Sequence, residues 1–227
     1  MRAFRRFAFE NGLSLVFLGL FLASLVGQSF AGWFEFNNHQ SAHDEPSLSY
    51  LRYIGSSDFG AHMLENWQSE WLQFWVFAIA TVWLIQKGSN ESKKPEDAGL
   101  EDDKTQRVGR FAGNDSPRWA RVKDWRYHLY ANSFVIVMGV IFLSTWIAQS
   151  WASWTVFNDE QVTHDEEPVS WGRYLVSSDF WERSLQNWQS EFLAVGTMVV
   201  LTIYLRQRGS PESKPVGAPH DETGSSG

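Results

Sequence analysis

The stretch LSLVFLGLFLASLVGQSFAGWF, residues 13–34, decides the fold class of this chain. No Asp, Glu, Lys or Arg interrupts it, and about 17–25 mainly apolar residues suffice for a helix to cross a bilayer. A second stretch of this kind runs from Phe134 to Trp154, and shorter apolar runs occupy Trp71–Gln86 and Phe192–Leu205. We therefore predict an all-α membrane protein with four transmembrane helices.

The amino-acid composition agrees with this prediction. Aromatic residues make up 16% of the chain, with 13 Trp, and Trp and Tyr gather at the two interfaces of a membrane. The mean hydropathy of −0.29 resembles that of a soluble protein only because the charged residues cluster outside the apolar runs. The chain has no Cys, which excludes disulfides and thiolate sites. A net charge of −7 and the lack of a basic recognition motif argue against a nucleic-acid partner.

The chain contains one unit twice, at an offset of 121 residues. NWQSEWL at residues 66–72 recurs as NWQSEFL at residues 187–193, and Gln28-Ser29 recurs as Gln149-Ser150. An internal repeat of this length indicates that a whole structural unit has been duplicated. Because each copy leaves one side of the membrane and returns to it, we predict two tandem two-helix repeats. A pseudo-two-fold axis along the membrane normal would relate them in parallel.

The predicted layout has four parts. The first repeat covers residues 1–93, with spans at about 13–34 and 66–86, and a cytoplasmic linker follows at 94–118. The second repeat covers 119–208, with spans at about 131–154 and 187–206, and a tail covers 209–227. Linker and tail are poor in apolar residues, so we predict that both are disordered. Residues 119–129 form a basic amphipathic segment that either lies on an anionic inner leaflet or extends the third span as a helix.

Basic residues set the predicted orientation. Arg residues at positions 2, 5 and 6 precede the first span, many Lys and Arg residues separate spans two and three, and Arg206 and Arg208 follow the fourth. By the positive-inside rule, both termini and the linker face the cytoplasm. Ser29-Phe30-Ala31 after the Arg-rich start also fits a cleavable signal peptide. A retained span is favoured, because the matching stretch Gln149–Trp154 lies in mid-chain.

Polar residues recur at one depth of the predicted spans. They are Gln28, Ser29, Glu70, Gln149, Ser150 and Glu191. At about 1.5 Å per residue, each lies roughly 22–24 Å along its helix from the inner boundary. Since lipid offers no hydrogen-bond partners, we expect these groups to face inward as an intramembrane polar layer, either as a functional site or as a contact that joins helices. Alternatively, Glu70 and Glu191 lie among the head groups.

The repeated NWQSE segment belongs to the second predicted helix of each copy and precedes its apolar run. We predict that it lies at the outer interface, with its Trp as the membrane anchor. The residues concerned are Asn66, Trp67, Gln68 and Ser69 in the first copy and Asn187, Trp188, Gln189 and Ser190 in the second.

A second candidate site lies in the outward loops. His43, Asp44 and Glu45 recur as His164, Asp165 and Glu166. Imidazole and carboxylate groups together can bind a divalent cation. Three consecutive side chains rarely converge on one ion, however, so a solvated acidic loop is the favoured interpretation.

Three segments of the sequence resemble a family of bacterial integral membrane proteins that is described only as a domain of unknown function. They are NGLSLVFLGLFLASLVGQS, NWQSEFL and LRQRGSPESKPVGAPH. The resemblance covers essentially the whole chain, and NWQSE and GSPESKPV are its most specific parts. It implies a bacterial inner-membrane protein with this duplicated layout, and it implies no activity, ligand or catalytic residue.

No nucleophile elbow, phosphate loop, dinucleotide fingerprint or kinase motif is present, so we expect no enzyme, no catalytic residue and no cofactor. The favoured hypothesis is a non-enzymatic scaffold or envelope-associated membrane component. The alternatives are a small transporter or channel that uses the polar layer, and metal binding by the outward loops. The expected partners are the lipid bilayer and a second copy of the chain, because four spans leave little room for a wide pore.

Overall fold

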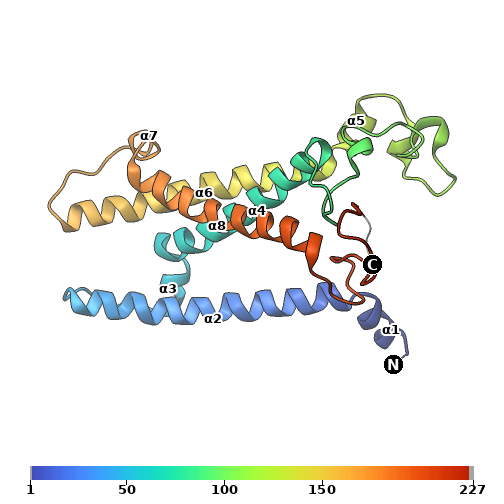
Figure 1. The fold of residues 1–227 in the computed structure, drawn as a ribbon. Coiled ribbons are helices and arrows are strands. Elements are labelled where there is room, and N and C mark those ends of the chain that lie inside the picture. The colour runs from blue at the N-terminus through green and yellow to red at the C-terminus, as the bar shows by residue number, and fades with distance from the viewer. Residues whose placement is uncertain (1, 225–227) are drawn as a thin grey trace. The chain divides into compact units, whose positions relative to one another are not determined.

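The computed structural model describes residues 2–224, which form helices and no strand (Figure 1). The α-helices are α1 (Arg2–Glu10), α2 (Gly12–Ala42), α3 (Tyr50–Ile54), α4 (Ser57–Trp83), α5 (Trp125–Ala131), α6 (Ser133–Thr163), α7 (Trp171–Tyr174) and α8 (Ser178–Tyr204). Three short 3-10 helices lie between α4 and α5: η1 (Pro95–Asp97), η2 (Gly109–Phe111) and η3 (Arg118–Arg121). The predicted all-α class is confirmed for the described residues.

The chain divides into two compact units. Unit 1 comprises Met1–Met63 and Ala152–Glu167, and unit 2 comprises Leu64–Trp151 and Pro168–Gly227. Unit 1 therefore holds α1, α2, α3, the first turns of α4 and the C-terminal part of α6. Unit 2 holds the rest of α4 and α6 together with α5, α7, α8 and the tail.

Among residues 2–224, two helices, α2 and α6, are long and apolar enough to cross a membrane. Each has 31 residues, and only 6% and 22% of their most apolar windows are buried. Most of their apolar side chains are therefore exposed and not packed in a protein core. The predicted first and third spans lie within these helices, apart from residues 131 and 132, which precede α6.

The predicted second and fourth spans are not confirmed. α4 and α8 have 27 residues each but are not apolar enough over their length to pass the same test. Both begin with polar residues, and they end at Trp83 and Tyr204, before the predicted limits of 86 and 206. The apolar parts that remain, residues 71–83 and 192–204, are about 20 Å long, whereas the hydrocarbon core of a bilayer is about 30 Å thick.

The helix bounds follow the offset seen in the sequence. α6 begins and ends 121 residues after α2, and α8 begins and ends 121 residues after α4. Serines place the starts of α4 and α8 in the same way. The hydroxyl of Ser56 accepts from the N–H of Phe59 at 3.3 Å, and that of Ser177 accepts from the N–H of Phe180 at 3.2 Å.

The ends of α2 and α6 explain the repeated His-Asp-Glu triplet. Asp44 and Asp165 both have a φ of 58°, the left-handed conformation that closes a helix. The N–H of Glu45 donates to the carbonyl of Gln40 at 2.9 Å, as a Schellman motif requires. The equivalent bond in the second copy, from residue 166 to residue 161, measures 2.8 Å. The triplets are helix-ending motifs.

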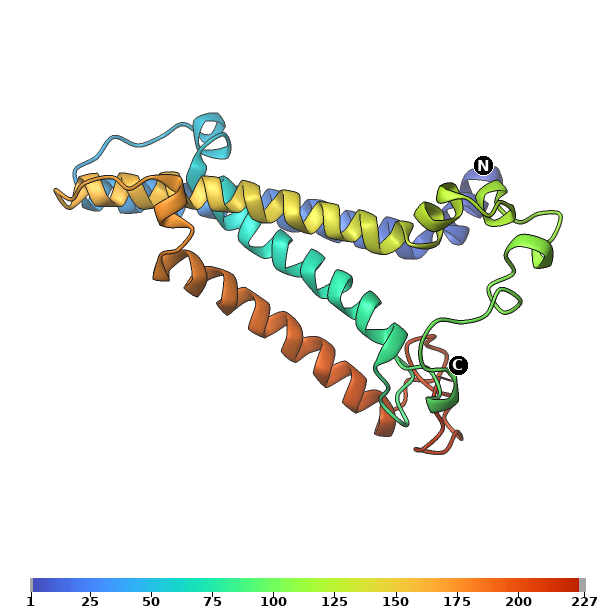
Figure 2. The same cartoon turned by 90° about the horizontal axis from the view of Figure 1, so that it is seen from above.

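Aromatic side chains hold unit 2 together between α4, α6 and α8. Phe142 of α6 is 4% exposed, and its ring stacks on Trp75 of α4 and on Trp146 of its own helix, with ring centroids 5.7 Å apart in both pairs. It meets Trp188 of α8 edge-on at 6.3 Å. Gly139 permits this approach, because a Cβ there would lie 2.8 Å from the Trp75 indole nitrogen. Figure 2 shows α4 between α6 and α8.

The linker and the tail, for which disorder is predicted, have these features within the described residues. Residues 94–118 form turns together with η1 and η2. Within residues 209–224, Ser213, Lys214 and Thr223 are buried. The described part of the tail makes polar contacts, chiefly those of the Lys214 ammonium.

The basic segment at residues 119–129 is not one amphipathic helix. The chain forms η3, breaks at residues 122–124, and begins α5 at Trp125. Asp124 causes the new start, because its carboxylate accepts from the N–H of Arg126 at 2.9 Å. Asn132 then separates α5 from α6, so this segment is also not a continuous extension of the third predicted span.

Candidate functional site

Buried polar side chains lie between α4, α6 and α8 in unit 2. They are Gln68 and Ser69 of α4, Gln149 and Ser150 of α6, and Ser184 of α8, each at most 2% exposed. We call these five residues the polar seam. Since packing removes them from solvent, their hydrogen bonds must come from the protein.

Tryptophans donate to the polar seam from neighbouring helices. Nε1 of Trp188 donates to Oε1 of Gln68 at 2.8 Å and so joins α8 to α4. Nε1 of Trp146 donates to the hydroxyl of Ser184 at 3.2 Å and joins α6 to α8. The indole of α7, at residue 171, donates to the hydroxyl of residue 150 at 3.2 Å. The seam therefore fastens helices to one another.

The structure places the six residues of the predicted polar layer in different environments. Ser29, Gln149 and Ser150 are buried, Gln28 and Glu70 are exposed, and Glu191 is half-buried. Within unit 2, the charge of Glu70 acts on Glu191. The buried polar level of unit 2 thus contains amides, hydroxyls and indoles, with the carboxylates at its edge.

The two copies of the outer-interface segment also differ. In the first copy Asn66 is exposed and Trp67 is half-buried, whereas Gln68 and Ser69 are buried. In the second copy Asn187 and Trp188 are half-buried, whereas Gln189 and Ser190 are exposed. One copy turns its amide and hydroxyl inward, and the other turns them outward.

Sequence reasoning missed the interior role of Gln68 and Ser69, and it missed Ser184 and Trp146 as members of the site. One pattern could have indicated Ser184. It lies four residues before Trp188, and residues four apart on a helix share a face. No comparable pattern distinguished the two NWQSE copies, because their letters are identical.

Salt bridges of Arg183 join α4 to α8 beside the polar seam. The residues involved precede the predicted second and fourth spans in the sequence. Nη1 of Arg183 donates to Glu65 at 3.2 Å, and Nε donates to Asp179 at 3.1 Å. The hydroxyl of Tyr174, which is fully buried, donates to the same Asp179 carboxylate at 2.9 Å. Burial alone would lower the pKa of Arg183, but the charges of Asp179 and Glu65 outweigh it and raise that pKa above its usual value.

In unit 1, the loop after α2 folds back onto the helix. Nε1 of Trp33 donates to the carbonyl of Leu48 at 2.7 Å. The side chain of Asn37 donates to the same carbonyl at 3.0 Å and accepts from the N–H of Leu48 at 2.8 Å. The hydroxyls of Ser29 and Tyr50 lie 2.8 Å apart. These bonds bury Ser29 against the loop.

Unit 1 also contains a cavity of about 660 Å³. Histidines and carboxylates of α2, the loop after it, α4 and α6 line it: His39, His43, His62, His164, Glu35, Glu45, Asp58, Asp159 and Glu160. The wall contains no Lys or Arg. The rings of His39 and His43 lie 4.4 Å apart between centroids. The cavity is therefore acidic when its histidines are neutral.

The metal hypothesis for the two triplets is not supported by this geometry. His43, Glu45 and His164 reach the cavity wall, whereas Asp44, Asp165 and Glu166 do not. Within residues 2–224, no group of three or more His, Asp and Glu side chains could hold a metal ion. The helix-ending motif sends consecutive side chains in different directions, which explains this result.

Asp58, before the predicted second span, makes unit 1 sensitive to pH. Burial has the largest effect and raises the pKa of its carboxyl above the usual 3.8. A backbone hydrogen bond and His62 lower this pKa by less, Asp159 raises it further, and His39 has the smallest, lowering effect. The folded state therefore binds this proton more tightly than the unfolded chain. Its contribution to stability is fully present below a pH of about 4 and is lost as the pH rises through the raised pKa.

We expect the Tm of the purified chain to decrease over that pH window, and Asp58→Asn to remove this part of the decrease. Asn stands in for the protonated carboxyl, so the variant should be the more stable protein at neutral pH. Asp97→Asn, at an exposed position, serves as the control and should follow the wild type. Parallel curves for the wild type and Asp58→Asn would contradict the assignment.

Comparison with known protein families shows which family the chain belongs to. A family model described as Domain of unknown function (DUF6766) matches residues 4–225. Searches among curated proteins and among solved structures gave no match. Because the family model matches nearly the whole sequence, the chain belongs to the family described as Domain of unknown function (DUF6766).

Proposed function

We propose that the chain is a multi-pass protein of the bacterial cytoplasmic membrane and acts there as a non-enzymatic structural component. The observation that carries the proposal is the exposure of apolar side chains on α2 and α6. Leu13 is 77% exposed and Leu20 59%, and on α6 Val140 is 57% and Ile147 55% exposed. Apolar surface in water costs about 25 cal/mol per Å², whereas lipid accommodates it. A signal sequence would not account for α6, which lies in mid-chain.

Contacts between equivalent positions support two tandem repeats around a pseudo-two-fold axis. Equivalent residues can meet only near the axis that relates them. Nδ2 of Asn90 donates at 3.2 Å to the carbonyl of Pro211, which holds the same place in the second copy. Glu70 acts electrostatically on Glu191, its own counterpart. We place the axis between α4 and α8.

We further propose that α4 and α8 cross the membrane, which gives four spans with both termini and the linker in the cytoplasm. Their polar starts would lie among the outer head groups, with Trp67 and Trp188 as anchors. Local thinning of the bilayer would match their short apolar parts. The basic residues before α2 and in the linker support this orientation.

The polar seam favours a structural role over transport. Gln68 bonds to Trp188 and Ser184 bonds to Trp146 across helix contacts. Glu70, the carboxylate that a transport path would use, is exposed. Hydrogen bonds between polar side chains are a common way to hold membrane helices together.

The test uses the absence of Cys from the chain. Single substitutions Ser47→Cys, Thr105→Cys and Glu167→Cys introduce one thiol each, at exposed positions in the first loop, the linker and the second loop. We expect a membrane-impermeant maleimide to label the first and third in intact cells, and the second only after lysis. The unsubstituted chain should give no labelling.

Two outcomes would contradict the proposal. If α2 and α6 alone crossed, the linker thiol would be labelled from outside and the Glu167→Cys thiol would be protected. If the chain were released from membranes by an alkaline carbonate wash, it would not be an integral membrane protein.

A further inference from the structure

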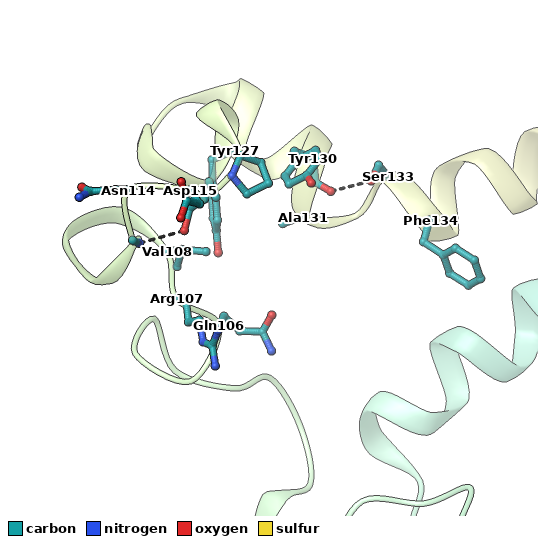
Figure 3. A pocket seen from close by; sticks show the side chains of 14 residues that line it. Gln106, Arg107, Val108, Asn114, Asp115, Tyr127, Tyr130, Ala131, Ser133 and Phe134 are labelled. Carbon is teal, nitrogen blue, oxygen red and sulfur yellow. Dashed lines mark hydrogen bonds between the residues drawn. The ribbon is translucent and has the colours of Figure 1, made fainter. Parts of the chain in front are cut away.

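A cavity of about 800 Å³ lies where the linker meets the start of α6 (Figure 3). Arg107 and Gln106 come from the linker, Tyr130 comes from α5, and Ser133 and Phe134 come from the first turn of α6. α6 is one of the two helices in the described residues that are apolar enough to cross a membrane, so the proposed membrane placement would put the head groups at this part of the chain.

The segment around the cavity is basic in a chain whose net charge is −7. It carries Lys104, Arg107, Arg110, Arg118, Arg121, Lys123 and Arg126 against Asp115 and Asp124. Anionic head groups attract such segments, by about 1 kcal/mol for each Lys or Arg near the surface.

Several of these arginines already have partners. Arg126 pairs with Asp124 at 2.7 Å, Arg121 donates to backbone carbonyls, and the guanidinium of Arg110 lies 4.7 Å from the centroid of the Phe111 ring. Arg107 lines the cavity, and no acceptor among residues 2–224 bonds to its guanidinium. Its planar donors suit a phosphate group.

Aromatic residues mark the same level. The rings of Trp119 and Trp125 lie 6.2 Å apart, and these side chains are 38% and 68% exposed. Tyr130, in the cavity wall, is 43% exposed. Exposed Trp and Tyr next to a membrane-crossing helix are typical of the interface, where their polar edges contact head groups.

We propose that this cavity binds the head group of an anionic phospholipid. Arg107 pairs with the phosphate, the hydroxyl of Tyr130 donates to one of its oxygens, and an acyl chain follows Phe134 along α6. The hydroxyl of Ser133 already donates to the backbone carbonyl of Tyr130 at 2.7 Å and so fixes the start of α6 beside the cavity. Asp115, also in the wall, would repel a second negative charge but accepts from hydroxyls. The site therefore favours a singly charged head group that carries hydroxyls, such as phosphoglycerol. The inference rests on the proposed placement in the membrane.

The test uses the full chain in nanodiscs of phosphatidylcholine with phosphatidylglycerol as the minor lipid. After transfer to a mild detergent, native mass spectrometry measures which lipid stays bound. We expect phosphatidylglycerol to be enriched over its share of the bilayer by roughly tenfold, as a charge-assisted contact implies. Arg107→Asn should abolish the enrichment, and Asn tolerates the positive φ of 52° at this position. Arg110→Asn should keep it.

Tyr130→Phe preserves the ring and should lower the enrichment by roughly threefold, the value of one neutral hydrogen bond. Equal retention of both lipids, or an unchanged enrichment in Arg107→Asn, would overturn the inference. Displacement of the lipid by soluble glycerol phosphate would assign the site to free phosphate esters and would also overturn it. Resistance to the carbonate wash, measured on the same sample, separates a failure of this inference from a failure of the proposed membrane placement.

Discussion

Phe142→Ala should lower the free energy of unfolding by about 3 kcal/mol, the low end of the range for a buried Phe. The ring is 4% exposed and touches aromatic rings of three helices, at Trp75, Trp146 and Trp188. Its removal leaves a cavity that those large rings cannot close. The low end of the range applies if the chain lies in a membrane as proposed, because lipid then replaces water outside the bundle and the loss comes mainly from packing.

The repeat supplies a matched control. Phe21 holds the same position in the first copy and is 43% exposed, so Phe21→Ala should cost less than about 1 kcal/mol. Unfolding of both variants can be followed by circular dichroism as a denaturing detergent is added. Equal losses of stability in the two variants would show that the aromatic cluster of unit 2 is not a stabilising core.

The sequence predicted the positions of the helices better than the side chains that they pack against. The uncharged stretches that begin near residues 13 and 134 gave α2 and α6, because helix length and apolarity are properties of the local sequence. The ends of α4 and α8 were placed two or three residues too late. Ile85 and Leu205 continue the apolar pattern, but turns closed by Ser92 and Ser213 follow, in which their hydroxyls accept from residues 86 and 207.

The outer-interface segment shows where local sequence stops being informative. The copies of NWQSE are identical, yet Gln68 is buried and Gln189 is exposed. The difference comes from other positions, since the second copy has Trp146 where the first has Leu25, and Gly196 where the first has Trp75. These substitutions build an aromatic cluster on one side only. Which copy faces it depends on packing that no single segment encodes.

Lys214→Met should release the tail from the rest of unit 2. This is the second large effect that we expect. The Lys214 side chain is 1% exposed, and its ammonium donates to four backbone carbonyls: those of Gly88 at 2.7 Å and of Pro219, His220 and Glu222 at 3.0 Å. The last three belong to the tail and the first belongs to the loop after α4. One side chain therefore fastens the tail to a loop of the other copy.

Methionine preserves the length of the stem but donates to none of these carbonyls, so the tail loses its charge-assisted bonds. Hydrogen bonds to a charged group contribute about 1.5–3 kcal/mol. We therefore expect amide exchange in residues 210–224 to accelerate roughly a hundredfold, and trypsin to cut sooner after Arg208. Lys94→Met, at an exposed position, should leave both measurements unchanged.

Thr223 also bonds to the loop after α4, because its hydroxyl accepts from the N–H of Gly88 at 2.8 Å. If exchange in Lys214→Met matched the wild type, that bond and its neighbours would hold the tail without the ammonium.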